Sequence, residues 1–132
     1  MPAVGHGSPM TTVMSDTEAD AFVASWMEAW NAHDVERIVA HYRDDVEYHS
    51  PFVARLADGD GALHGRDAVR AYVAAGLGRY PDLHFDPPTT LAVGAGSIAI
   101  VYRSVDDLVA VETLVLDDDG LVVRAHCHYA GR

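Results

Sequence analysis

The chain has 132 residues, enough for one domain with a sizeable core, and 49% of them are hydrophobic, which is typical of a globular protein. Its formal net charge of −11 argues against nucleic acid or an anionic membrane as a partner, because both require a basic surface. The single cysteine, Cys127, excludes a disulfide framework within the chain and a cysteine-based zinc knuckle.

The N-terminus has no charged segment followed by an apolar stretch, and no run of about 18 apolar residues occurs anywhere. We therefore expect no membrane span and a cytoplasmic location. Residues 1–14 are rich in glycine and proline without periodicity, which predicts a flexible arm. Residues 15–130 are predicted to form one domain.

The first part of this domain has helical periodicity. Ser15 to Glu18 is a capping-box pattern, and apolar residues follow at a 3.6-residue spacing up to Trp30. Asp34 can cap a second helix. A third helix begins near Arg66, after a loop over residues 57–65, and ends at Pro81. The buried face of the second helix would consist of Val35, Ile38, Val39 and Tyr42.

The remaining segments have the two-residue periodicity of strands. Residues 46–50 alternate in this way after a turn predicted at Asp44-Asp45, and Pro51 ends the strand. Further strands are predicted over residues 83–85, 91–93, 97–104, 108–116 and 121–129. This order predicts an α+β fold, with helices on one face of a curved sheet and an apolar pocket between them. A ferredoxin-like fold would alternate βαββαβ instead, and the two N-terminal helices argue against it.

Glu112 is the strongest candidate for chemistry. Strict alternation places it on one strand face with Leu108, Ala110, Leu114 and Leu116. A carboxyl group among aliphatic side chains has a raised pKa, which suits a general acid or base. The alternatives are an edge strand at this point, or an ion pair between Glu112 and an arginine such as Arg103.

His126 and His128 form a His-x-His pattern on the last predicted strand. Alternation places them with Val122 and Arg124, facing away from the helices, whereas Cys127 and Tyr129 belong to the apolar face. No third ligand lies nearby in sequence, so we expect no metal site. Cys127 has no apparent base beside it and is interpreted as a small buried hydrophobe.

Two segments resemble a known superfamily. Ala29-Trp30-Asn31-Ala32-His33-Asp34, followed by Ile38, Tyr42 and Asp44-Asp45-Val46, resembles the opening of NTF2-like domains, and residues 63–70 resemble their loop before the third helix. The chain is most similar to SnoaL-like and ketosteroid-isomerase-like domains over roughly residues 15–130. The resemblance implies a cone of three N-terminal helices packed on a curved, mostly antiparallel sheet. This fold hosts isomerases, cyclases, dehydratases, epoxide hydrolases and non-catalytic modules.

The resemblance also assigns positions. Ketosteroid isomerase uses an Asp base together with Tyr and protonated Asp donors. The Tyr position falls on Trp26, the base position on Ser50 and the third position on Glu112. Because an indole only donates and a serine is no base near neutral pH, standard steroid isomerisation is not expected. The Arg-x-Asp strand pattern of the epoxide hydrolases is broken at residues 103–105.

We therefore expect an acid–base isomerase, cyclase or lyase that acts on a small hydrophobic or polyketide-like molecule without a cofactor. Glu112 would be the acid or base, and Tyr48 or Ser50, which the resemblance places inward, would orient the ligand. Candidate ligand contacts are Trp26, Trp30, His64, Cys127 and Tyr129. The resemblance also implies a homodimer through the sheet face that bears Arg124, His126 and His128. The alternative is a non-catalytic ligand-binding or dimerisation module.

Overall fold

The computed structural model describes residues 13–56 and 60–131. Residues 1–12 of the predicted arm lie outside the described residues, as do residues 57–59 of the predicted loop. Val13 forms an isolated antiparallel bridge with Ala95, and Met14 packs against the core. The last two residues of the predicted arm are therefore attached to the domain.

The described residues form four α-helices, six strands and one 3₁₀ helix. In chain order the elements are α1 (Asp16–Asn31), α2 (Val35–Val39), β1 (Tyr42–His49), α3 (Pro51–Leu56), β2 (Ala62–His64), α4 (Arg66–Arg79), β3 (Thr90–Gly94), β4 (Ser97–Arg103), η1 (Val105–Asp107), β5 (Val109–Leu116) and β6 (Val122–Ala130). The short α3 and β2 were not predicted from the sequence. None of the described helices is both long enough and apolar enough to cross a membrane.

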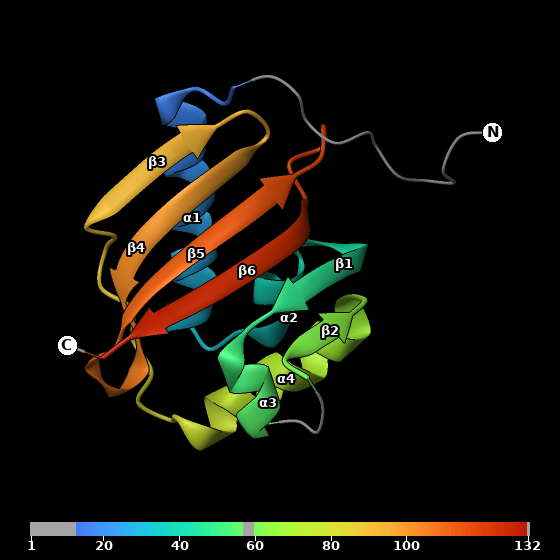
Figure 1. The fold of residues 1–132 in the computed structure, drawn as a ribbon, viewed down its shortest axis with the longest axis vertical. Helices are drawn as coiled ribbons and strands as arrows, with labels where there is room; N and C mark the ends of the chain where they lie inside the picture. The colour runs from blue at the N-terminus through green and yellow to red at the C-terminus, as the bar shows by residue number, and fades with distance from the viewer. Residues whose placement is uncertain (1–12, 57–59, 132) are drawn as a thin grey trace.

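The strands form one sheet in the order β2-β1-β6-β5-β4-β3. Among these neighbours β1 and β6 form the one parallel pair, and the other pairs are antiparallel. Figure 1 shows α1 crossing behind β3 to β6, with α3 and α4 gathered at the end of the sheet formed by β1 and β2. The predicted α+β class, with helices packed on a curved and mostly antiparallel sheet, is confirmed.

The predicted caps position the two N-terminal helices. The Ser15 hydroxyl accepts a hydrogen bond from the Glu18 amide at 3.1 Å, and the Glu18 carboxylate accepts one from the Ser15 amide at 2.9 Å. Asp34 accepts a bond from the Arg37 amide at 3.2 Å and so begins α2. The second helix is only five residues long, and Tyr42 belongs to β1 instead of the predicted helix.

Two predictions about the sheet were wrong because the strands contain bulges. Asp44 and Asp45 form no turn and lie within β1, whose pairing with β6 shifts register between Tyr42 and Glu47. Val122 was predicted to face away from the helices with Arg124, but it is fully buried opposite Leu116. The register shift beside Leu116 inserts an extra residue, which reverses the direction of Val122.

The strand predicted over residues 83–85 does not form. Pro81, Pro87 and Pro88 flank this segment and lack the amide donors that a strand ladder requires. The Asn31 side chain instead accepts a hydrogen bond from the Phe85 amide at 2.7 Å and donates one to the Phe85 carbonyl at 2.9 Å. A ring nitrogen of His33 lies 2.8 Å from the Leu83 carbonyl oxygen. Side chains at the end of α1 thus hold a segment that has no strand partner.

Replacing Asn31 with alanine tests this attachment. Removing both partly buried bonds to Phe85 is expected to lower the free energy of unfolding by about 2 kcal/mol. The measurement is urea denaturation followed by circular dichroism. Thr89→Val, which removes an exposed hydroxyl bond to the Val101 carbonyl, is the control and is expected to change stability by less than about 0.5 kcal/mol. Equal effects of the two substitutions would contradict this role of Asn31.

Candidate functional site

Glu112 lies at the middle of β5, between Ile100 of β4 and Cys127 of β6. Its side chain is buried, with 2% of its surface exposed, on the same strand face as Ala110, Leu114 and Leu116. The alternation that the sequence predicted for this strand is therefore confirmed. The ion pair considered for Glu112 is absent, because Arg103 is exposed and lies 3.5 Å from the carboxylate of Asp107.

The two oxygens of the Glu112 carboxyl group differ in their partners. The Tyr102 hydroxyl donates a hydrogen bond of 2.8 Å to Oε1. No described residue donates a hydrogen bond to Oε2, which is also fully buried. A buried polar atom without a partner is costly and is a recognised sign of a functional group. Oε2 therefore retains an unused capacity to accept a hydrogen bond.

Burial raises the pKa of Glu112 to about 7, and the Tyr102 hydroxyl and the neighbouring Cys127 thiol oppose this rise. A carboxyl group with a pKa near 7 exchanges a proton readily at neutral pH, in either direction. The electrostatic environment of Glu112 is therefore suited to general acid or general base chemistry.

Glu112 faces a small interior cavity of about 50 Å³. This volume holds roughly one or two water molecules. Of the predicted site residues, Trp30, Tyr48, Glu112 and Tyr129 line it together. The sequence did not identify the other main lining residues as part of a site, namely Phe52, Tyr72, Tyr80, Phe85 and Tyr102. The cavity thus combines one carboxyl group with several tyrosine hydroxyls on mostly aromatic walls.

Two other predicted residues, Ser50 and Cys127, are not among the lining residues of the cavity. Ser50 accepts a hydrogen bond from the Phe52 amide at 3.2 Å, which places it at the start of α3, and its hydroxyl interacts with those of Tyr72 and Tyr129. The Cys127 thiol lies 3.5 Å from the Tyr48 hydroxyl, to which it donates. Both side chains support the residues that face the cavity.

Trp26 and His64 lie elsewhere. The Trp26 indole donates a hydrogen bond of 3.0 Å to the Tyr42 hydroxyl and is 1% exposed, which places it in the core. His64 is exposed on β2, opposite Glu47. Neither residue lines the interior cavity.

The cavity has an identifiable mouth. A hollow of about 320 Å³ on the surface shares Tyr80, Leu83, Ser104 and Val105 with the cavity lining. At this mouth the Tyr80 hydroxyl donates a hydrogen bond of 3.3 Å to the Asp106 carboxylate. The bond joins the end of α4 to the η1 turn between β4 and β5. One exposed hydrogen bond therefore spans this mouth.

Tyr102 lines the cavity and bonds to Glu112, and sequence reasoning missed it. A signal for it exists in the alternation of Ile98, Ile100 and Tyr102 along β4, all of which are buried. Its proximity to Glu112 depends on the pairing of Ile100 with Glu112, which places Tyr102 one diagonal position away. Periodicity predicts the inward direction of Tyr102, whereas only the strand register predicts its partner.

The opposite face of the sheet bears Arg124, His126 and His128, as predicted. The rings of His126 and His49 stack with centroids 4.4 Å apart and planes 1° apart, and Arg124 lies 3.6 Å from the Glu47 carboxylate. Burial is the main cause that lowers the pKa of His126, and the neighbouring His49 adds to this effect. Within residues 13–56 and 60–131, no three His, Cys, Asp or Glu side chains gather in a way that could hold a metal ion.

Comparison with known proteins supports the assignment of the fold. The model of the SnoaL-like domain matches residues 23–130. A SnoaL-like protein of unknown function from Burkholderia thailandensis is 38% identical, with a TM-score of 0.82 over 89% of this chain and 99% of that chain. A search of curated proteins finds no significant match.

Two further solved structures share the fold at lower identity. A protein of unknown function with a cystatin-like fold, from Methylobium petroleophilum, is 15% identical, with a TM-score of 0.71 over 91% of this chain and 80% of that chain. A proposed ketosteroid isomerase from Kribbella flavida is 22% identical, with a TM-score of 0.61 over 85% of this chain and 77% of that chain. At these identities the likeness concerns the fold alone.

Replacing Glu112 with glutamine tests the burial of an ionisable group. Because the folded-state pKa is about 7 and the ordinary value is 4.5, folding of the wild type is stabilised by protonation below pH 4.5, and this contribution is lost as pH rises through 7. The free energy of unfolding of the wild type is expected to lose about 3 kcal/mol of this contribution over that pH range. Glu112→Gln is therefore expected to gain stability relative to the wild type between pH 4.5 and pH 8, measured by urea denaturation at both values. A pH-independent difference would contradict the raised pKa.

Proposed function

The chain belongs to the SnoaL-like domain family, and within this family we propose that it is an acid–base enzyme acting on a small apolar molecule. Glu112 is the residue that takes up and returns the proton. The observation that carries this proposal is the Glu112 Oε2 atom, which is buried beside a cavity and has no hydrogen-bond donor among the described residues.

The proposed reaction begins with the ionised Glu112 carboxylate. Oε2 removes a proton from a carbon next to a carbonyl group, and the electron pair of that C–H bond moves onto the carbonyl oxygen as an enolate forms. The protonated Glu112 then returns the proton to the same or another carbon. Isomerisation, aldol-type cyclisation and elimination can all begin with this proton transfer, so they require the same base.

The tyrosine hydroxyls supply the remaining roles. The Tyr102 hydroxyl bonds to Oε1 and so fixes the orientation of the carboxyl group, which leaves Oε2 as the atom that takes the proton. Tyr48 and Tyr129 face the same cavity and can donate to the substrate oxygen on which charge develops. Burial raises the pKa of each hydroxyl above its usual value of 10, so both are protonated donors at neutral pH. Ser50 is a positioning residue, through its contacts with Tyr72 and Tyr129.

One observation favours the alternative of a non-catalytic module. The cavity of about 50 Å³ is smaller than the roughly 300–1,000 Å³ that is usual for small-molecule sites. An enzyme would therefore widen this cavity when substrate enters through the mouth at Tyr80 and Asp106. A module that only dimerises would keep the cavity closed. Measurements of proton exchange on a substrate distinguish the enzyme from such a module.

A hydrogen-exchange assay tests the catalytic role without a known substrate. A panel of small apolar ketones is incubated with the protein in D₂O, and deuterium incorporation next to the carbonyl is followed by mass spectrometry. Exchange is expected to increase with pH up to about 7, where Glu112 becomes ionised, and then to level off. Glu112→Gln is expected to reduce the rate by about 100-fold or more, and Tyr102→Phe by about tenfold.

The matched control for this assay is Glu47→Gln, which makes the same substitution on the opposite face of the sheet and is expected to leave the rate unchanged. Full exchange by Glu112→Gln, or no exchange by the wild type with any ketone of the panel, would count against the enzyme and in favour of the non-catalytic alternative.

We also propose that the protein forms a homodimer through the sheet face that bears Arg124, His126 and His128. Half-buried valines lie beside these residues on that face, and Val111 pairs with Val101 on one side and with His128 on the other. Figure 1 shows no helix in front of these strands. A face with apolar side chains at its centre and charged groups at its edge suits an isologous contact between two copies.

Val111→Asp is expected to convert this dimer into a monomer, because it buries an unpaired charge at the centre of the interface. Analytical ultracentrifugation gives the molecular mass in solution. The control is Val13→Asp, the same substitution at a valine that is 64% exposed and bridges Ala95 in the turn between β3 and β4, outside β5 and β6. A monomeric wild type, or a dimer that survives Val111→Asp, would refute the proposed interface.

A further inference from the structure

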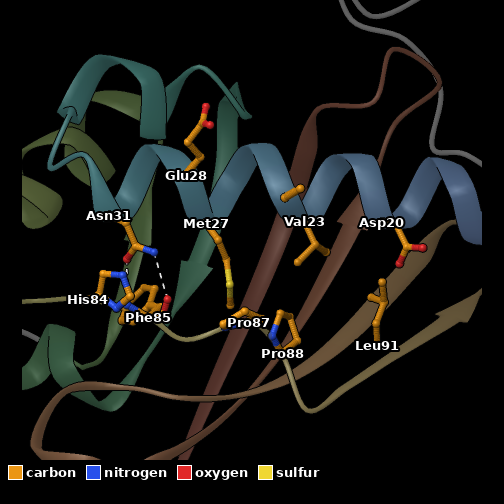
Figure 2. A pocket seen from close by; sticks show the side chains of 11 residues that line it. Asp20, Val23, Met27, Glu28, Asn31, His84, Phe85, Pro87, Pro88 and Leu91 are labelled. Atoms are coloured by element: carbon orange, nitrogen blue, oxygen red, sulfur yellow. Dashed lines mark hydrogen bonds between the residues drawn. The ribbon is translucent and has the colours of Figure 1, made fainter.

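A groove of about 480 Å³ lies between α1 and residues 84–91, outside the interior cavity. Val23 and Met27 of α1 form one wall, and Phe85, Pro87, Pro88 and Leu91 form the other. Figure 2 shows the side chains of Val23 and Met27 pointing from the helix toward the two prolines. The volume falls within the roughly 300–1,000 Å³ that is usual for small-molecule sites.

Both walls of the groove are fixed in place. Val23 and Met27 are 3% and 6% exposed and belong to the hydrophobic core. Opposite them, the Asn31 side chain holds the backbone of Phe85 through two hydrogen bonds, drawn as dashed lines in Figure 2. The rings of Pro87 and Pro88 restrict the backbone that follows. The groove is therefore formed before any ligand binds, which lowers the entropic cost of binding.

The charges at the groove exclude anions. Its lining residues include the acidic Asp20 and Glu28 and no arginine. Asp20 is exposed next to Leu91, whereas Figure 2 shows the Glu28 side chain pointing away from the prolines, where it pairs with Arg37 at 2.6 Å. The whole chain carries a net charge of −11, which adds to the negative potential. A ligand of this groove is thus expected to be apolar and to carry no negative charge.

Phe85 separates the groove from the cavity of Glu112. It lines both spaces, and no other described residue does so. Phe85 is 5% exposed, and its ring stacks on Trp26 and packs against Tyr102. We propose that the groove is a second binding site, for an apolar small molecule without negative charge, separate from the Glu112 cavity. This inference does not rest on the proposed enzymatic function.

Two fluorescent probes test the chemistry of the ligand. N-phenyl-1-naphthylamine is neutral, and 1-anilinonaphthalene-8-sulfonate has the same ring system with a sulfonate added. The neutral probe is expected to bind the wild type with a rise in fluorescence, and the sulfonate is expected to bind about fivefold more weakly or worse. Absence of binding by the neutral probe, or tighter binding of the sulfonate, would overturn the proposal.

Two alanines on α1 locate the bound probe. Ala24 and Ala21 are both exposed, but Ala24 lines the groove and Ala21 does not. Ala24→Trp fills the groove and is expected to weaken binding of the neutral probe by about tenfold or more, while Ala21→Trp changes it by less than about twofold. Leu91→Gln makes the opposite wall of the groove polar and is likewise expected to weaken binding of the neutral probe.

Glu112→Gln separates this inference from the proposed function, because it is expected to bind the neutral probe as the wild type does. Equal binding by Ala24→Trp, Leu91→Gln and the wild type would place the probe elsewhere and would refute the groove as a site. If Glu112→Gln alone lost binding, the probe would lie in the interior cavity, and this result would also refute the groove as a site.

Discussion

The interior of this domain is organised around the buried carboxyl group of Glu112. Glu112 lies on the fifth strand of a six-stranded sheet, with a strand paired on each side and with aromatic side chains above it. Such a group destabilises the fold when it is ionised, since burial raises its pKa to about 7. The ladders of β4, β5 and β6 make the site rigid enough to tolerate this cost. A group that reduces stability and has an unpartnered oxygen is more readily explained by chemistry than by structure.

Residues 80–88 determine how the interior meets the solvent. Tyr80, Leu83 and Phe85 face the cavity of Glu112, whereas Pro87 and Pro88 face the groove beside α1. Because this segment has no strand neighbour, its backbone groups depend on side chains from the end of α1, above all on Asn31. One irregular segment therefore forms walls of both spaces, and its attachment to α1 sets their shapes.

Local patterns in the sequence predicted those parts of the fold that local interactions determine. The capping box at Ser15 begins α1 as expected, and the alternation around Glu112 gives the correct buried face of β5. Prediction failed where distant segments decide the structure. The bulges that bury Val122 and place Asp44 within β1 depend on pairing between strands. The conformation of residues 83–85 depends on hydrogen bonds between Phe85 and Asn31, which are more than 50 residues apart.

The same distinction applies to the candidate site. Glu112 was found because burial follows from the periodicity of its own strand. Tyr102, its hydrogen-bond partner, was missed because their contact depends on the register between β4 and β5. Ser50 was expected to face a ligand, yet the short helix that follows it recruits its hydroxyl as a cap for the Phe52 amide.

The small size of the interior cavity does not argue strongly against a substrate, because the mouth is weakly closed. The bond between Tyr80 and Asp106 is exposed and 3.3 Å long, and such a bond contributes about 1 kcal/mol or less. Asp106 and Asp107 also have positive φ angles of 55° and 59°, which cost a non-glycine residue about 1 kcal/mol each. The turn that supplies the closing carboxylate is therefore itself strained. Opening the mouth requires loss of this weak bond and movement of the Tyr80 ring, which packs edge-on against Phe52, whereas the carboxyl of Glu112 is held by the sheet.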